Sequence, residues 1–306
     1  MPEVLSIKAP AKINLHLAIG ELRNDGFHSL TSVFQAISIF DELNIWLNET
    51  SEIELVCEVD CPPQRNTMYQ AAVLCLKHAY RQGLSAKTGI CIHASKGIPS
   101  GAGLGGGSSD AAAVIKAIAS LLPTYFSKDA LESIAAKVGS DVPFFLGSAC
   151  ALVGGRGELL EELESRTDYS ILVVYPGFSI NTAFAFRTLD AYRAVSGWKG
   201  MEGNDNLWIP ELRRNLSRAY LWEDPDSWPF RNDFFECLLP SFPALDGCRK
   251  LLLDSGADFA SLSGSGSTVF GVFKALEPQE EAFLALREAG FNPIRAFPLA
   301  RLPESD

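Results

Sequence analysis

Residues 97–110 read Gly97-Ile98-Pro99-Ser100-Gly101-Ala102-Gly103-Leu104-Gly105-Gly106-Gly107-Ser108-Ser109-Asp110, and six of the first eleven are glycine. Ordering glycine costs more conformational entropy than ordering any other residue, so this density indicates positive φ angles or close approach of the backbone to a ligand. A strand is predicted before the run, at residues 88–94, and a helix after it, at residues 111–122. Consecutive amide groups before a helix form an anion site, which the helix dipole strengthens. The run therefore predicts a phosphate-binding loop, with a flexible linker or a tight turn as the alternative.

Two common phosphate loops do not fit this run. Residues 101–106 spell G-x-G-x-x-G, but the dinucleotide motif also needs an acidic residue about 20 positions later, at the end of another strand. In this chain the predicted helix leads instead into the apolar Leu121-Leu122-Pro123. The Walker pattern fails because no lysine precedes Ser108. The loop is therefore predicted to be of another class.

Three further segments place polar residues at defined positions. Residues 5–17 alternate in polarity, which puts Lys12 and Asn14 on one face of a predicted strand; the alternative is a solvated strand face. A second segment, Gly139-Ser140-Asp141-Val142-Pro143, places an acidic residue where a new segment of the chain begins. The alternative to a functional role for Asp141 is a helix cap. Ser263-Gly264-Ser265-Gly266-Ser267 is a second loop of small residues. Each segment is a weak signal when taken alone.

The length of 306 residues indicates about two domains. We expect domains at 1–157 and 158–306, because the sequence near residues 154–164 is rich first in glycine and then in glutamate, which is typical of a domain boundary. The other predicted strands are residues 30–39, 43–47, 53–59, 169–175, 259–262 and 268–273. The other predicted helices are residues 67–82, 128–138, 232–239, 243–255 and 278–289. Residues 192–228 give no firm prediction.

Charge and cysteine content limit the classes of partner and compartment. The net charge of −11 argues against nucleic acid as a partner, because affinity for a phosphate backbone needs a basic surface. The seven cysteines are odd in number and lie mostly in apolar runs, so we expect buried free thiols and a reducing compartment. No signal peptide or membrane-spanning run is present in the sequence, which favours a cytoplasmic protein with no membrane partner. The sequence indicates no particular oligomeric state.

Taken together, Pro10-Ala11-Lys12-Ile13-Asn14-Leu15, the glycine-rich run, the Asp141 segment and the Ser263 loop resemble the GHMP kinases, a superfamily that includes galactokinase and the homoserine and mevalonate kinases. The resemblance spans about 260 residues of the chain. Asp25-Gly26-Phe27-His28-Ser29-Leu30 and Pro176-Gly177-Phe178-Ser179-Ile180-Asn181-Thr182 look most like the branch whose acceptor is a cytidyl-linked methylerythritol of the non-mevalonate isoprenoid pathway. The resemblance implies an α+β fold with an N-terminal ATP-binding domain and a C-terminal α/β sandwich domain.

The resemblance also implies roles for individual residues. Asp141 would act as the base toward the substrate hydroxyl, and Lys12 would hold that hydroxyl and the transferring phosphoryl group. The loop around the ATP phosphates would consist of Pro99, Ser100, Gly101, Ala102, Gly103, Leu104, Gly105, Gly106, Gly107, Ser108 and Ser109. Magnesium is expected with ATP, with Ser108 or Ser109 as a ligand and no acidic ligand identified.

For the cytidyl substrate, the resemblance implies Asn14, Phe27 and His28 as binding residues, together with Phe184 or Phe186 as a second ring. His28 would read the cytosine, and the aromatic rings would stack on it. The family commonly has tyrosine before this histidine, whereas this chain has Phe27, which keeps the stacking and loses a hydroxyl contact. Two rival functions share these residues: a kinase for mevalonate, homoserine or a sugar, and a non-catalytic nucleotide sensor.

Overall fold

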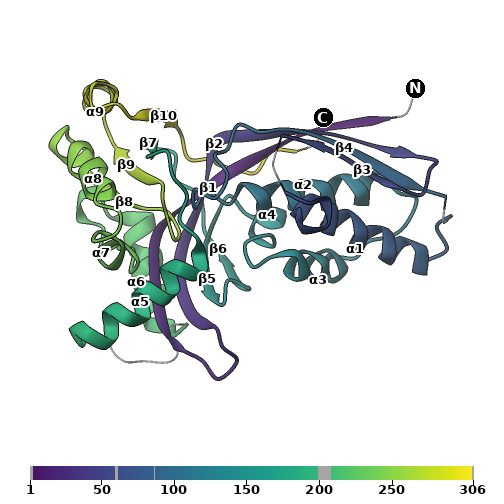
Figure 1. The fold of residues 1–306 in the computed structure, drawn as a ribbon, viewed down its shortest axis with the longest axis horizontal. Helices are drawn as coiled ribbons and strands as arrows, with labels where there is room; N and C mark the ends of the chain where they lie inside the picture. The colour runs from purple at the N-terminus through teal and green to yellow at the C-terminus, as the bar shows by residue number, and fades with distance from the viewer. Residues whose placement is uncertain (1–2, 59–60, 86, 199–207, 305–306) are drawn as a thin grey trace.

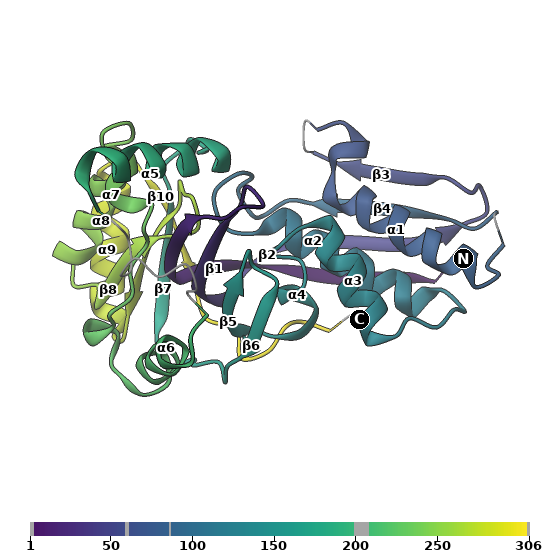
Figure 2. The ribbon, with the colours of Figure 1, turned by 90° about the horizontal axis from the view of Figure 1, so that it is seen from below.

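Two β-sheets with helices packed against them build the chain (Figures 1 and 2). The computed structural model describes residues 3–58, 61–85, 87–198 and 208–304. The first sheet has the order β3-β4-β2-β5-β6, with β1 paired to β2, and the second has the order β10-β7-β9-β8. The predicted α+β architecture in two halves is confirmed.

The strands are β1 (Val4–Leu22), β2 (His28–Asn48), β3 (Ile53–Cys57), β4 (Gly89–Ser95), β5 (Cys150–Gly155), β6 (Leu159–Glu162), β7 (Ser170–Tyr175), β8 (Phe259–Leu262), β9 (Val269–Phe273) and β10 (Asn292–Ala296). The α-helices are α1 (Thr67–Arg81), α2 (Gly106–Leu121), α3 (Lys128–Val138), α4 (Phe144–Gly147), α5 (Thr182–Ser196), α6 (Pro210–Trp222), α7 (Phe235–Leu238), α8 (Ala244–Asp254) and α9 (Leu276–Glu288). Two short 3-10 helices are η1 (Pro63–Arg65) and η2 (Pro225–Ser227).

The long hairpin of β1 and β2 passes through both halves of the molecule (Figure 1). Its side chains enter three hydrophobic clusters in turn: Ile7 packs in the cluster under α1 and α2, Ile13 in the cluster between the two sheets, and Leu17 in the cluster under α8 and α9. Because protein covers both faces of β1 from Ala9 to Gly20, the polar residues of this stretch are buried as well. The predicted alternation is correct, but the polar face of Lys12 and Asn14 is not solvated.

The glycine-rich run links β4 to α2, as the sequence predicts. The helix begins at Gly106, however, five residues earlier than the predicted start at residue 111. Gly105 is the N-cap in the left-handed conformation, and Gly106 and Gly107 form the first turn. Their poor helix propensity is offset by packing, since the alanine-rich helix is buried along Ala111–Ala113 and at Ile115.

Several other predicted elements need correction. The strands predicted at residues 30–39 and 43–47 form the single strand β2, because pairing with β1 continues past the buried Asp41 after a bulge. The helix predicted at residues 232–239 shrinks to α7, since the Asn232 side chain bonds to backbone groups and holds a turn there. No element was predicted at β5, β6, β10, α4, α5 or α6. Of the unassigned residues 192–228, positions 199–207 lie outside the described residues.

The change from the first sheet to the second falls between β6, which pairs with β5, and β7. The domain division at residue 157 stays a prediction. None of the described helices has the length and apolar character that a membrane span requires.

Candidate active site

The glycine loop bends at three alternate residues. Gly101, Gly103 and Gly105 have φ angles of 66°, 80° and 72°, which L side chains rarely adopt. A Cβ at Gly103 would lie 2.2 Å from the carbonyl oxygen of Ser263, and a Cβ at Gly105 would lie 2.9 Å from Cγ of Lys12. These glycines are therefore required both by backbone conformation and by close approach of neighbouring segments.

The second loop of small residues packs directly on the glycine loop. Ser263 Oγ donates to the carbonyl of Gly103 at 2.9 Å, and the amide of Thr268 donates to the carbonyl of Ala102 at 3.1 Å. On the other side, the amide of Lys12 donates to the carbonyl of Leu104 at 2.8 Å. The carbonyls of residues 102–104 are thus used by the protein. By contrast, no side chain among the described residues caps the N-terminus of α2, and its first turn contains no acidic residue. Both conditions are required if this helix end is to bind an anion.

Lys12 and Asp141 meet beside this loop. Lys12 Nζ lies 3.2 Å from Asp141 Oδ2, donates to Asn14 Oδ1 at 2.6 Å and sits 4.1 Å from the centre of the Phe34 ring. The Lys12 side chain is 5% exposed and that of Asp141 is 31% exposed, so the ion pair opens to solvent on the carboxylate side. A buried ammonium is tolerated because these partners compensate its lost hydration.

Asn14 is placed to orient the lysine. Its Oδ1 accepts from Lys12, and its Nδ2 donates to Ser32 Oγ at 3.0 Å. Its backbone amide donates to Ser263 Oγ at 3.3 Å. The predicted contact of Asn14 with substrate stays a prediction.

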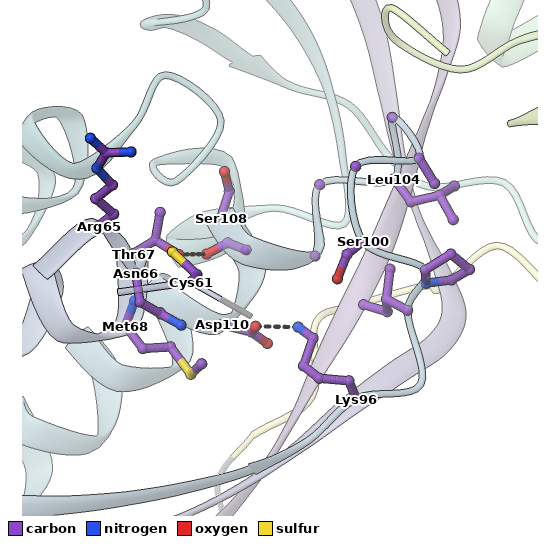
Figure 3. Close-up of a pocket in the computed structure, with 18 residues that line it drawn as sticks. Cys61, Arg65, Asn66, Thr67, Met68, Lys96, Ser100, Leu104, Ser108 and Asp110 are labelled. Carbon is purple, nitrogen blue, oxygen red and sulfur yellow. Dashed lines mark hydrogen bonds and ion pairs between the residues drawn. The ribbon is translucent and has the colours of Figure 1, made fainter. Parts of the chain in front are cut away.

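A cavity of about 360 Å³ lies between the glycine loop and the start of α1 (Figure 3). Most of the loop lines it, including Pro99, Ser100 and Ser108, and Asn66, Thr67 and Met68 face it from α1 and the preceding residue. Thr67 Oγ1 donates to the carbonyl of Gly107 at 2.6 Å, which fixes α1 to the first turn of α2. The cavity has the size of a small-ligand site.

The residues predicted to hold cytosine lie at the end of the β1–β2 hairpin. The His28 ring stacks on Phe186 with centroids 5.1 Å apart, its Nδ1 lies 2.9 Å from the carbonyl oxygen of Gly20, and its Nε2 lies 3.5 Å from Asp190 Oδ2. Phe27 is 55% exposed, with the Arg156 guanidinium 5.0 Å from its ring centre.

The structure separates the two phenylalanines that the sequence left as alternatives. Phe186 lies against His28, whereas the Phe184 ring packs edge-on against Phe242 with centroids 6.0 Å apart. The two residues are two positions apart on α5, so they point to opposite sides of the helix. Of the two, only Phe186 is brought to the histidine.

The two serines predicted as magnesium ligands differ in placement. Ser108 lines the cavity, whereas Ser109 is buried in α2 and its hydroxyl has no hydrogen-bond partner among the described residues. Within the described part of the chain, no cluster of three or more His, Cys, Asp or Glu could hold a metal ion. Magnesium that arrives with a nucleotide keeps several water and phosphate ligands, so a single hydroxyl such as that of Ser108 fits its needs.

Comparison with known proteins identifies the family. Residues 66–149 match the family described as "GHMP kinases N terminal domain", and residues 211–292 match "GHMP kinases C terminal". The chain belongs to the GHMP kinases. It is 35% identical to the 4-diphosphocytidyl-2-C-methyl-D-erythritol kinase of Thermodesulfovibrio yellowstonii, over 88% of this chain and 90% of that one. It is 37% identical to the same-named protein of Treponema pallidum, over 91% and 93% of the two chains.

Solved structures of GHMP kinases share the fold. A crystal structure of 4-(cytidine 5'-diphospho)-2C-methyl-D-erythritol kinase superposes with a TM-score of 0.75 at 29% identity, covering 95% of this chain and 98% of that one. Homoserine kinase from Cytophaga hutchinsonii superposes with a TM-score of 0.73 at 18% identity, covering 100% and 98%. The second likeness shows the fold alone. The predicted family and its two-part GHMP kinase architecture are confirmed.

Several residues of this site were not found from the sequence. Asn66 caps α1, since its side chain accepts from the amide of Met68, and the same residue lines the cavity. Lys96, the residue after β4, lines the same cavity and belongs to none of the motifs described above. Ser32 matters only because β2 places it beside Asn14. None of these could be found before the elements were packed together.

Proposed function

We propose that this chain is a kinase that transfers the γ-phosphoryl group of ATP to a hydroxyl of 4-diphosphocytidyl-2-C-methyl-D-erythritol, in non-mevalonate isoprenoid precursor synthesis. The observation that carries the proposal is the contact of Lys12 Nζ and Asp141 Oδ2 at 3.2 Å, beside a glycine loop whose helix N-terminus is left uncapped. A nucleotide sensor has no use for this pair. The identity of 35–37% with kinases named for this substrate supports the choice of acceptor.

The residues suit an in-line phosphoryl transfer. Asp141 accepts the proton of the substrate hydroxyl as its oxygen bonds to the γ-phosphorus, and the bond from that phosphorus to the β–γ bridging oxygen breaks, which releases ADP. Lys12 offsets the negative charge of the transferring group, and the amides of the glycine loop hold the phosphates. Such reactions depend mainly on positioning and charge stabilisation.

We assign ATP binding to the residue range 1–157, with magnesium held by the phosphates and Ser108. The cytosine lies between Phe27 and Phe186, and to take this place it displaces the His28 ring from its stack on Phe186 to the edge of the base. Lys12 Nζ lies over the ring of Phe34. His28 and Phe34 are six residues apart on β2, or roughly 20 Å along the strand, so an elongated substrate could reach from His28 to Lys12. A cytosolic location goes with this proposal, because the buried cysteines Cys75, Cys91, Cys150, Cys237 and Cys248 form no disulfide.

The direct test supplies purified protein with ATP, magnesium and one acceptor at a time, and measures ADP release by a coupled assay. We expect turnover with 4-diphosphocytidyl-2-C-methyl-D-erythritol and little with mevalonate, homoserine or galactose. Preferential phosphorylation of one of the other acceptors would refute the proposed substrate. Absence of ADP release with every acceptor, from protein that binds ATP, would favour the sensor.

A further inference from the structure

A buried carboxylate from β2 holds the first residues of the glycine loop. Asp41 is fully buried, and its Oδ1 accepts from the amides of Gly97 at 2.7 Å and Ile98 at 2.8 Å. Its Oδ2 contacts Lys96 Nζ. Asp41 pairs with Ala9 of β1, so this carboxylate is fixed to the sheet. The start of the loop therefore has a rigid anchor.

Lys96 connects the same anchor to the far end of the loop. Its Nζ also contacts Asp110 Oδ2, which lies just beyond the first turn of α2 (Figure 3). Residues 96 and 110 lie at the two ends of the glycine loop, and the Lys96 ammonium group links Asp110 to Asp41. The loop is thus closed at both ends onto Asp41.

A lysine beside a phosphate loop would ordinarily be interpreted as a phosphate ligand. Here the ammonium is shared by two carboxylates, and the Lys96 side chain is only 13% exposed. Burial raises the pKa of Asp110 to about 7 against the opposing effect of Lys96, and its second oxygen has no hydrogen-bond partner among the described residues. At neutral pH Asp110 is therefore partly protonated, and the net charge of Asp41, Lys96 and Asp110 together is zero or negative, never positive. Charge attraction is therefore not its contribution to binding a triphosphate.

We propose that Asp41 and Lys96 are positioning residues, which fix the course of residues 97–105 so that the loop amides meet the nucleotide phosphates, and that Lys96 does not itself bind phosphate. This inference rests on the proposed use of ATP. Buried ion pairs contribute little net stability, so a role in fixing geometry explains the cost of burying three charged groups.

The deciding variant is Asp41→Asn, because a purely electrostatic role and a positioning role of Asp41 predict opposite changes in nucleotide affinity. Loss of a negative charge behind the loop, by electrostatics alone, tightens binding of an anion. Loss of the anchor weakens it, and we expect the dissociation constant for the non-hydrolysable analogue AMPPNP and the KM for ATP to rise at least tenfold. The KM for the cytidyl substrate should stay within about twofold. The matched control is Glu42→Gln, which removes the same charge from the exposed neighbouring residue.

Calorimetric titration with AMPPNP and amide hydrogen exchange of the nucleotide-free protein supply the readouts. Unchanged or tighter AMPPNP binding by Asp41→Asn would overturn the proposal. If that variant does not fold, Lys96→Met decides: faster exchange at Gly97 and Ile98 without nucleotide supports positioning, and unchanged exchange overturns it. Wild-type protein that fails to bind AMPPNP would refute ATP use instead, and the exchange data would still test the anchor.

Discussion

At the scale of single residues, Lys12 can be buried only because its partners are in place. Lys12 comes from β1, Asp141 follows α3, and Asn14 is held in turn by Ser32 and Ser263. These groups lie up to about 250 positions apart in the chain, since Asn14 and Ser263 are separated by 249. The ion pair is therefore sensitive to how the two halves of the protein pack.

Asp141→Asn removes the proton acceptor and the charge opposite Lys12. We expect the turnover number to fall by roughly 10² to 10⁴, the usual range for loss of a general base. Affinity for AMPPNP should change less than threefold. Lys12→Ala should also reduce turnover, and Lys8→Ala is its control, because Lys8 lies on the same strand but is 62% exposed. Turnover that persists in both Asp141→Asn and Lys12→Ala would remove these residues from the mechanism.

Phe186→Ala tests the stacking partner of the cytosine. A base stacked on an aromatic ring contributes about 1–3 kcal/mol, so the KM for the cytidyl substrate should rise about tenfold or more while the KM for ATP is preserved. Phe184→Ala is the matched control, because its ring packs on Phe242 instead. His28→Ala should raise the same KM. Equal effects of the two phenylalanine variants would contradict the assignment.

At the scale of elements, the glycine loop is shaped by its contact with the Ser263 loop. Gly103→Ala would place a Cβ 2.2 Å from a backbone carbonyl, so one of the two loops must shift. Gly83→Ala is the control: its φ of 94° is also positive, but the added Cβ meets nothing within 4 Å. We expect Gly83→Ala to cost about 1 kcal/mol of unfolding free energy and Gly103→Ala about 2 kcal/mol more. Urea denaturation measures both, and equal losses would argue against tight docking of the loops.

The sequence predicted elements best where a local signal marks both ends. Residues 128–138 are the helix α3, begun by a bond from the Ala130 amide to Ser127 Oγ and ended at Gly139. Strand β8 also has its predicted bounds. The loop and the pair of Lys12 and Asp141 followed from motifs. The short strand β6 reads Leu159-Leu160-Glu161-Glu162, which lacks the alternation of polar and apolar residues that indicates a strand, so it was missed. The choice of Phe186 over Phe184 needed the packing of α5.

At the scale of the whole molecule, the β1–β2 hairpin carries a buried histidine between the two halves. His16 is 2% exposed, and its Nδ1 accepts from the backbone amide of Arg231 at 3.3 Å. Burial lowers the pKa of His16 to about 3, with a smaller contribution from the charge of Arg231. The folded protein therefore holds this ring neutral where the unfolded chain takes up a proton.

This difference predicts a loss of stability in acid. Between the unfolded pKa of 6.5 and the folded pKa of about 3, the unfolded state binds more protons, so the free energy of unfolding falls as the pH drops. Wild type should lose about 2 kcal/mol more than His16→Gln between pH 7 and pH 5. Urea denaturation of both proteins at the two pH values supplies the comparison. A difference that does not change with pH would contradict the buried neutral histidine.

The central claim is that the glycine loop holds the ATP phosphates beside Lys12 and Asp141. A crystal structure of the protein with AMPPNP and cytidine diphosphate tests it most directly. We predict the triphosphate against the amides of residues 103–109, with its γ-phosphate next to Lys12, and the cytosine between Phe27 and Phe186. A triphosphate bound elsewhere, or a γ-phosphate that faces away from both charged residues, would contradict the account.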